Sequence, residues 1–385
     1  MKKFIILLLI GLFIIPISVF AEEEKSELLK NATSGLLMEQ TTGEIIFEKD
    51  KDKKVAVASM TKMVAQTIIL ENIESGKIKW DDIVKVSKNA ADMGGSQIYL
   101  TANEKMSVKD LFKGISMASA NDATVAMAEY IAGTEQAFVK QMNKKVKELG
   151  LKNTQFKNAT GLDEDGHYSS AYDMAVIARN LLNHEEILKF SSVYEDYLRQ
   201  DTENKFWLIN TNKLVRYYEG ADGLKTGHTD AAKYCLAATA KKNKMRLIAV
   251  VLGEEESKVR NSEAMALLDY GFNNKKMTTI KSKGEVVEEI TFDKGNKDKI
   301  SIVPKNDIGV LQDKNTDKHE YSYKVKLNDI ELPIKKNDKI GEIKVYEKNK
   351  FITKGDLVSN TSVDKLNYLE LYKETIKNSI MGIIN

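Results

Sequence analysis

Apolar and polar positions alternate along the chain with two different periods, which indicates both helices and strands. Apolar residues recur at helical spacing in the segments 55–73, 108–132, 134–149, 173–182 and 262–270. Short apolar runs typical of strands occupy 32–49 (two strands around a turn), 234–241 and 246–252. Strands at both ends with helices between them predict an α/β or α+β domain, a sheet flanked by helices, that ends near residue 274.

The pattern changes after residue 274. Residues 275–361 alternate short β-like runs with lysine- and acid-rich turns, which predicts a small all-β domain. Helical spacing returns in the tail, 362–385, where one apolar stripe consists of Leu366, Leu369, Tyr372, Ile376, Ile380 and Ile383. We expect this tail to be an amphipathic helix that lies on a membrane surface. The alternative is a helix docked on its own protein.

The N-terminus has the pattern of a secretory signal peptide. Lys2 and Lys3 precede an apolar run over residues 4–20, and Ala21 is followed by acidic residues. We expect residues 1–21 to be removed after Ala21, with a retained membrane anchor as the alternative. The mature protein is then expected outside the cytoplasm, peripheral on the outer face of the cytoplasmic membrane or in the cell wall space.

Composition excludes several classes of function. The chain has 58 basic and 56 acidic residues, and loss of residues 1–21 removes two lysines, so the mature protein is formally neutral. No segment concentrates basic charge as a nucleic-acid-binding protein does. The single cysteine, Cys235, excludes an internal disulfide and a cysteine-based metal site. We expect neither a metal nor a cofactor, although His167 in an acidic loop leaves a metal site as an alternative.

A candidate nucleophile opens the segment 55–73. In Ser59-Met60-Thr61-Lys62, positions i and i+3 share a helix face, so Lys62 can reach the Ser59 hydroxyl. Serine needs a base to become nucleophilic, and a lysine serves as that base only when its pKa is lowered. The same spacing recurs at Ser362 and Lys365, but without companion motifs, and we set it aside.

Two further motifs follow in the order that is recognised for acyl transfer, SxxK, SxN and KTG. They are Ser119-Ala120-Asn121, in an alanine-rich stretch, and Lys225-Thr226-Gly227. A second SxN at residues 87–89 sits in a charged turn and is set aside. Ser119 and Asn121 are expected to bridge the base, the substrate amide and the leaving group, and Lys225 to supply a second cation that keeps Lys62 neutral.

The KTG motif also suggests how a substrate binds. Thr226 and the backbone from Gly227 to Thr229 can hydrogen-bond an extended peptide along a strand edge. Gly227 would leave room for that close approach. His228, in the same stretch, is expected to line the cleft without acting as the base.

With these motifs the chain resembles the low-molecular-mass penicillin-binding proteins, the serine-type D-alanyl-D-alanine carboxypeptidases. The resemblance extends to the segments 34–43, 94–98, 156–173 and 210–214. It implies a serine penicillin-recognising transpeptidase-like domain over residues 22–274, a small β domain over 275–361 and a C-terminal amphipathic helix over 362–385. It therefore covers nearly all of the mature chain.

The resemblance also implies an activity. The substrate would be a peptidoglycan stem peptide that ends in D-Ala-D-Ala, cleaved through an acyl-enzyme on Ser59 during cell wall maturation. Penicillins would inhibit by acylating the same serine. Arg260 matches an arginine that supports binding of the substrate carboxylate in this family, together with Lys225; an ordinary surface arginine is the alternative.

Other functions use the same motifs. A class A-like β-lactamase would need a positioned glutamate, and Glu164 is available but not in a recognisable setting. A D,D-endopeptidase would use the same residues on cross-linked peptides. A non-catalytic penicillin sensor would keep the fold without turnover.

Overall fold

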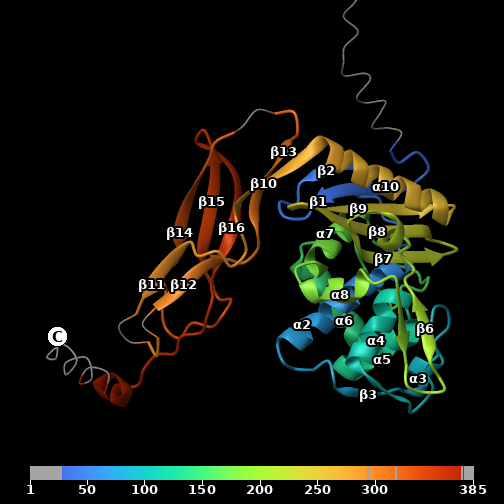
Figure 1. Ribbon diagram of the computed structural model, residues 1–385. Coiled ribbons are helices and arrows are strands. Elements are labelled where there is room, and N and C mark those ends of the chain that lie inside the picture. Colours follow the sequence, from blue (N-terminus) through green and yellow to red (C-terminus); the bar gives the residue numbers. More distant parts are fainter. Residues whose placement is uncertain (1–27, 293–294, 298, 317–318, 374–375, 377–385) are drawn as a thin grey trace, which may run out of the picture. The chain divides into compact units, whose positions relative to one another are not determined.

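The computed structural model describes residues 28–292, 295–297, 299–316, 319–373 and 376 (Figure 1). The predicted signal peptide (1–21) and the end of the predicted tail (377–385) lie outside the described residues. The chain forms two compact units. The first comprises Met1–Met38, Ile45–Lys241 and Leu247–Gly271, and the second comprises Glu39–Glu44, Lys242–Arg246 and Phe272–Asn385. Neither unit is continuous in sequence. The units therefore do not test the predicted domain limits, which stay predictions.

A five-stranded sheet with the strand order β2-β1-β9-β8-β7 organises the first unit (Figure 1). The strands are β1 (Ser34–Glu39), β2 (Ile45–Lys49), β7 (Ala221–Thr229), β8 (Lys233–Lys242) and β9 (Met245–Glu254). Strand β7, with the sequence ADGLKTGHT, lies at one edge of this sheet and pairs antiparallel with β8. The predicted N-terminal hairpin and the two predicted neighbouring strands are thus confirmed.

Helices cover the sheet on both faces (Figure 1). Helix α10 (Ser257–Asn274) lies on one face, where Gly271 lets it approach closely, since a Cβ there would stand 2.5 Å from Leu247 Cδ1. The opposite side holds α2 (Lys62–Glu74), α4 (Val108–Lys113), α5 (Asn121–Ala132), α6 (Glu135–Glu148) and α7 (Ala171–Leu181). Shorter elements connect them: η1 (Ala58–Thr61), α3 (Lys88–Ala91), η2 (Gly114–Ala118), η3 (Glu185–Ile187), α8 (Leu188–Ser191), α9 (Leu214–Tyr217), β3 (Ile83–Lys85), β4 (Lys105–Ser107), β5 (Glu195–Leu198) and β6 (Phe206–Ile209).

Helix α2 runs through the core of the first unit. Its residues Met63, Ile69 and Leu70 are all at most 1% exposed. Burial of a side chain of this size contributes about 1.5–3 kcal/mol to stability. Every residue from Lys62 to Leu70 is buried, so packing holds α2 on all sides and makes it a rigid base for the residues at its N-terminal end.

Two predicted helices are wrong in detail. The helix predicted from residue 55 begins only at Lys62, because Val55 pairs with Ser169 as an isolated bridge and Ala58 has a left-handed φ of 47°. The helix predicted over 108–132 is broken by the π-helical turn η2 and by Ser119, whose φ is 62°. Both breaks fall at the predicted chemical motifs. The helix predicted over 262–270 is longer, as α10 shows.

The second unit contains a five-stranded sheet with the order β11-β12-β16-β15-β14 and a two-stranded ribbon, β10-β13. Its strands are β10 (Lys275–Lys281), β11 (Glu288–Thr291), β12 (Lys299–Pro304), β13 (Ile308–Asp313), β14 (Tyr321–Leu327), β15 (Lys339–Glu347) and β16 (Lys350–Ser359). Alternate residues such as Ile300, Ile302, Ile343 and Val345 form one apolar core. The small all-β domain is confirmed.

That core extends a few residues past the last strand. Val363 is fully buried and its backbone pairs with Ile334. Residues 368–373 are helical, with Tyr368 93% exposed and Tyr372 66% exposed. No helix among the described residues is long and apolar enough to cross a membrane.

Candidate active site

Ser59 lies in a tight turn directly before α2. The turn closes through a hydrogen bond from the Met60 N–H to the Val57 carbonyl, at 3.1 Å. Glycines on two other segments leave space for it. A Cβ on Gly161 would stand 1.9 Å from the Ala58 carbonyl oxygen, and one on Gly227 would stand 2.6 Å from the Val57 carbonyl oxygen. The room at Gly227 that we expected a substrate to use is therefore filled by the turn itself.

Lys62 is fully buried in the first turn of α2. Its Nζ lies 2.8 Å from Ser59 Oγ and donates to Asn121 Oδ1 and to the Thr160 carbonyl, both at 2.7 Å. Burial lowers its pKa well below the usual value, and the positive charge of Lys225 lowers it further. The structure thus brings the predicted serine, the predicted base and the predicted asparagine into direct contact.

The break after η2 positions the SxN motif. Ser119 is 5% exposed, and its left-handed backbone turns the chain so that Asn121 starts α5. The Asn121 Nδ2 donates to the Gly94 carbonyl at 2.7 Å, and its backbone N–H donates to the Ser96 carbonyl at 2.7 Å. The orientation of the amide is therefore fixed, with its oxygen directed at Lys62.

Lys225 and Thr226 lie in the edge strand β7. Burial and the nearby Arg260 lower the pKa of Lys225 to about 7, and its Nζ donates to the Thr226 carbonyl at 2.9 Å. The Thr226 hydroxyl donates to Thr211 Oγ1 at 2.8 Å. Arg260 therefore disfavours protonation of Lys225, and Lys225 disfavours protonation of Lys62.

Arg260, on α10, is a buried residue and not the surface arginine of the alternative interpretation. It is 5% exposed, and its Nη2 donates to Asn261 Oδ1 at 2.8 Å. Its guanidinium lies 6.0 Å from the ring centre of Tyr234, and burial lowers its pKa to about 10. Arg260 therefore adds positive charge behind Lys225.

The end of β7 is more open. His228 is exposed and stacks on Tyr234, with 4.1 Å between ring centres. The Thr229 hydroxyl donates to Asp163 Oδ1 at 2.7 Å, which joins β7 to the loop that also contains Thr160 and Gly161. This loop therefore contacts Lys62 through Thr160 and the end of β7 through Asp163.

His167 holds the same loop against the turn that contains Ser59 (the nucleophile turn of the mechanism proposed below). Its Nδ1 accepts the Lys157 N–H at 3.3 Å, so its Nε2 carries the proton and donates to Thr61 Oγ1 at 2.8 Å. Burial lowers the pKa of His167 to about 4, which keeps it neutral. Within the described part of the chain, no three histidine, cysteine, aspartate or glutamate side chains gather closely enough to hold a metal ion, at His167 or elsewhere.

Several contacts were missed by sequence reasoning. The Thr160 carbonyl, the Thr211 hydroxyl and the His167 ring each contact a motif residue, although none belongs to a motif. Thr160 and Thr211 lie in segments that carry the family resemblance, which was the available signal. Every residue has a backbone carbonyl, so the contact that the Thr160 carbonyl makes with Lys62 could be found only from the structure.

Comparison with known proteins identifies this arrangement. Residues 21–256 match the family of D-alanyl-D-alanine carboxypeptidases, and residues 276–365 match the C-terminal domain of penicillin-binding protein 5. The chain belongs to the D-alanyl-D-alanine carboxypeptidase family. It is therefore a serine-type carboxypeptidase of this family, whose reaction passes through an acyl-enzyme.

Members of the family are similar over most of this chain. D-alanyl-D-alanine carboxypeptidase DacF of Bacillus subtilis is 43% identical over 98% of this chain and 98% of its own length. Penicillin-binding protein 5 of Haemophilus influenzae has 32% identity and a TM-score of 0.68, covering 87% of this chain and 98% of that one. Penicillin-binding protein D2 of Listeria monocytogenes, solved with bound ampicillin, has 30% identity and a TM-score of 0.57, covering 63% of this chain and 97% of that one.

Proposed function

We propose that Ser59 is the nucleophile and Lys62 the general base that releases D-alanine from stem peptides ending in D-Ala-D-Ala. The contact of 2.8 Å between Lys62 Nζ and Ser59 Oγ carries this proposal. A neutral lysine has two N–H donors and one lone pair. Asn121 Oδ1 and the Thr160 carbonyl use the donors, so the lone pair faces the Ser59 hydroxyl proton.

The reaction then follows from these positions. Ser59 Oγ attacks the carbonyl carbon of the penultimate D-alanine while its proton passes to Lys62. The C–N bond breaks, D-alanine leaves with a proton on its nitrogen, and water later hydrolyses the ester. In this proposal the Ser119 hydroxyl passes that proton from Lys62 to the leaving nitrogen, while Asn121, whose amide is held between Lys62 and the Gly94 carbonyl, orients the base.

The positive charges of Lys225 and Arg260 position the substrate. Lys225, backed by Arg260, binds the terminal carboxylate, since an anion restores the protonated form of a lysine with a pKa near 7. Thr226, Gly227, His228 and Thr229 line the edge of β7, along which an extended peptide can hydrogen-bond. The position of β7 at the edge of the sheet and the buried cations favour an extended substrate that ends in a carboxylate.

We also propose that β-lactams acylate Ser59, as the ampicillin-bound relative suggests. The Lys62→Ala variant tests the role of the base. Loss of the base should slow acylation by a fluorescent penicillin by about 10²–10⁴-fold. Near-normal labelling would contradict the proposal. A label on the wild type that persists favours a carboxypeptidase, whereas its rapid loss would indicate a β-lactamase.

We further propose that the protein is exported, after removal of residues 1–21, and associates with the outer face of the cytoplasmic membrane through its tail. Apolar side chains on the described part of the tail support this, since Tyr368, Leu369 and Tyr372 are 93%, 67% and 66% exposed. An amphipathic helix buries such side chains at a lipid interface.

A further inference from the structure

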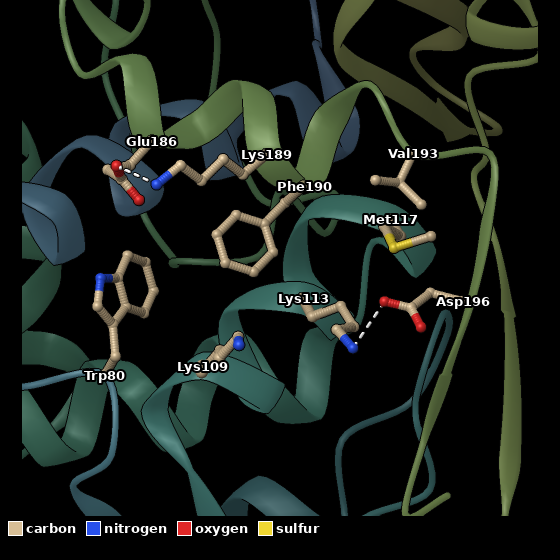
Figure 2. A pocket seen from close by; sticks show the side chains of 9 residues that line it. All are labelled: Trp80, Lys109, Lys113, Met117, Glu186, Lys189, Phe190, Val193 and Asp196. Atoms are coloured by element: carbon tan, nitrogen blue, oxygen red, sulfur yellow. Dashed lines mark ion pairs between the residues drawn. The ribbon is translucent and has the colours of Figure 1, made fainter.

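A cavity of about 420 Å³ lies in the first unit, lined by residues outside the proposed active site (Figure 2). Its walls come from α4, η2, η3, α8 and β5, together with Trp80 and Val193. The volume lies within the range of small-molecule sites, which is about 300–1,000 Å³. The cavity is therefore large enough for a ligand with one or two rings.

The floor of the cavity is apolar and partly aromatic. Met117 and Phe190 are 1% and 7% exposed, and Val193 closes one side. The rings of Trp80 and Phe190 have centres 5.4 Å apart and a tilt of 35°, and Trp80 is half-buried. The two rings therefore pack on each other, and the exposed part of Trp80 offers an aromatic face to an apolar ring.

The rim carries one positive charge in excess. Lys189 pairs with Glu186 at 2.6 Å and Lys113 with Asp196 at 2.7 Å, as the dashed lines in Figure 2 show. Lys109 forms no hydrogen bond or ion pair through its side chain with any described residue, although its charge helps to keep the pKa of Asp196 low. A single anionic group on the ligand would complement this rim.

Met117, in the floor of the cavity, is connected by hydrogen bonds to the proposed active site. The Met117 carbonyl accepts the Thr211 N–H at 3.0 Å, and the Thr211 hydroxyl accepts a hydrogen bond from Thr226 at 2.8 Å. Ser119 follows Met117 by two residues, at the end of the same turn. A ligand that moved Met117 would therefore shift both the SxN and the KTG motifs.

We propose that this cavity binds a small carboxylate with a flat apolar body, and that its occupancy changes the rate of acylation at Ser59. The flat body lies on Trp80 and Phe190, and the carboxylate pairs with Lys109. Only the rate readout rests on the proposed function, because ligand binding can be measured without it.

Binding of 2-naphthoate to the full chain is measured by titration calorimetry. The variants Lys109→Glu, which reverses the rim charge, and Val193→Phe, which fills the cavity, are each expected to weaken binding about tenfold or more. Lys140→Glu, an exposed lysine on α6, is the matched control for net charge and should bind as the wild type does. The neutral 2-naphthamide should bind about tenfold more weakly than 2-naphthoate.

Acylation by a fluorescent penicillin is then followed with and without 2-naphthoate. The ligand should change the rate in the wild type and in Lys140→Glu but not in the two cavity variants, whose rates without ligand should equal that of the wild type. No binding, equal binding in all four proteins, equal binding of the amide, or binding without a rate change would each overturn the proposal. Absence of binding together with a dimer in sedimentation would overturn it in favour of a second copy of the chain.

Discussion

At the scale of single residues, the central feature is a lysine whose pKa the protein lowers. Lys62 is fully buried, and its pKa is lowered first by burial and then by Lys225. In the proposed mechanism the neutral form is the base, so the acidic limb of the acylation rate should report its protonation. As the pH falls, Lys225 becomes charged and suppresses protonation of Lys62, which extends the range in which the base is active.

The Lys225→Met variant tests this coupling. Without the positive charge, the pKa of Lys62 rises, and the acidic limb of the acylation rate is expected at a higher pH than in the wild type. The measurement is the rate of acylation by a fluorescent penicillin from pH 5 to 10. Lys225→Arg keeps the charge and should leave the limb near its original position. An unchanged limb in Lys225→Met would show that Lys225 does not set the pKa of the base.

At the scale of elements, the short turn before α2 depends on glycines elsewhere in the chain. Gly161 has a left-handed φ of 87°, and its missing side chain makes room for the Ala58 carbonyl. The loop that contains it also supplies the Thr160 carbonyl to Lys62. The loop and the turn therefore form one structural unit, which fixes the distance between nucleophile and base.

Substitution Gly161→Ala should displace the nucleophile turn, because its Cβ would stand 1.9 Å from the Ala58 carbonyl oxygen. We expect acylation to fall by about 10²-fold or more, as a misplacement of about 1 Å can cause. Gly76→Ala is the matched control, since Gly76 has a φ of 74° but no atom within 4 Å of such a Cβ. That control should cost about 1 kcal/mol of stability and leave acylation intact. Equal loss of acylation in both variants would contradict the role of Gly161 in placing the turn.

The sequence predicts the elements well and their interruptions poorly. The positions of α6, α7, β8 and β9 follow from apolar periodicity, because local burial decides them. The break at Ser119 does not, since a left-handed serine in an alanine- and methionine-rich stretch is imposed by tertiary contacts. The contacts of Thr160 and His167 were missed because they join segments about a hundred residues apart.

The motif residues themselves could be predicted from sequence because their chemistry needs specific side chains. Ser59, Lys62 and Asn121 are in contact as expected. Gly227 was expected to leave room for the substrate, but the space beside it is occupied by the turn that contains Ser59. A glycine that is needed for close packing of two backbone segments cannot be recognised as such from the sequence alone.

At the scale of the whole molecule, the tail begins where the second core ends. Val363 is fully buried, whereas Tyr368, five residues later, is 93% exposed. The Asn367 Oδ1 accepts the N–H groups of Leu369 and Glu370, at 3.0 Å each, and so starts a new helix. The tail can therefore be removed at Asn367 without loss of the β core.

Deletion of residues 367–385 should release the protein from membranes while activity on a soluble peptide is unchanged. The physical reason is loss of the exposed apolar surface that we propose to bind lipid. Flotation with vesicles measures binding. A full-length control with Leu369→Ser and Tyr372→Ser should show a similar loss, since these side chains are 67% and 66% exposed. Unchanged flotation of the truncated protein would show that the tail is not the anchor.

The most direct measurement is D-alanine release from a soluble peptide that ends in D-Ala-D-Ala, with the wild type and Ser59→Ala side by side. We expect release by the wild type and none above background by the variant, with similar melting temperatures for the two proteins. Release by both proteins would contradict the assignment of the nucleophile. No release by the wild type, with penicillin still attached to Ser59, would contradict the carboxypeptidase and favour an endopeptidase or a sensor.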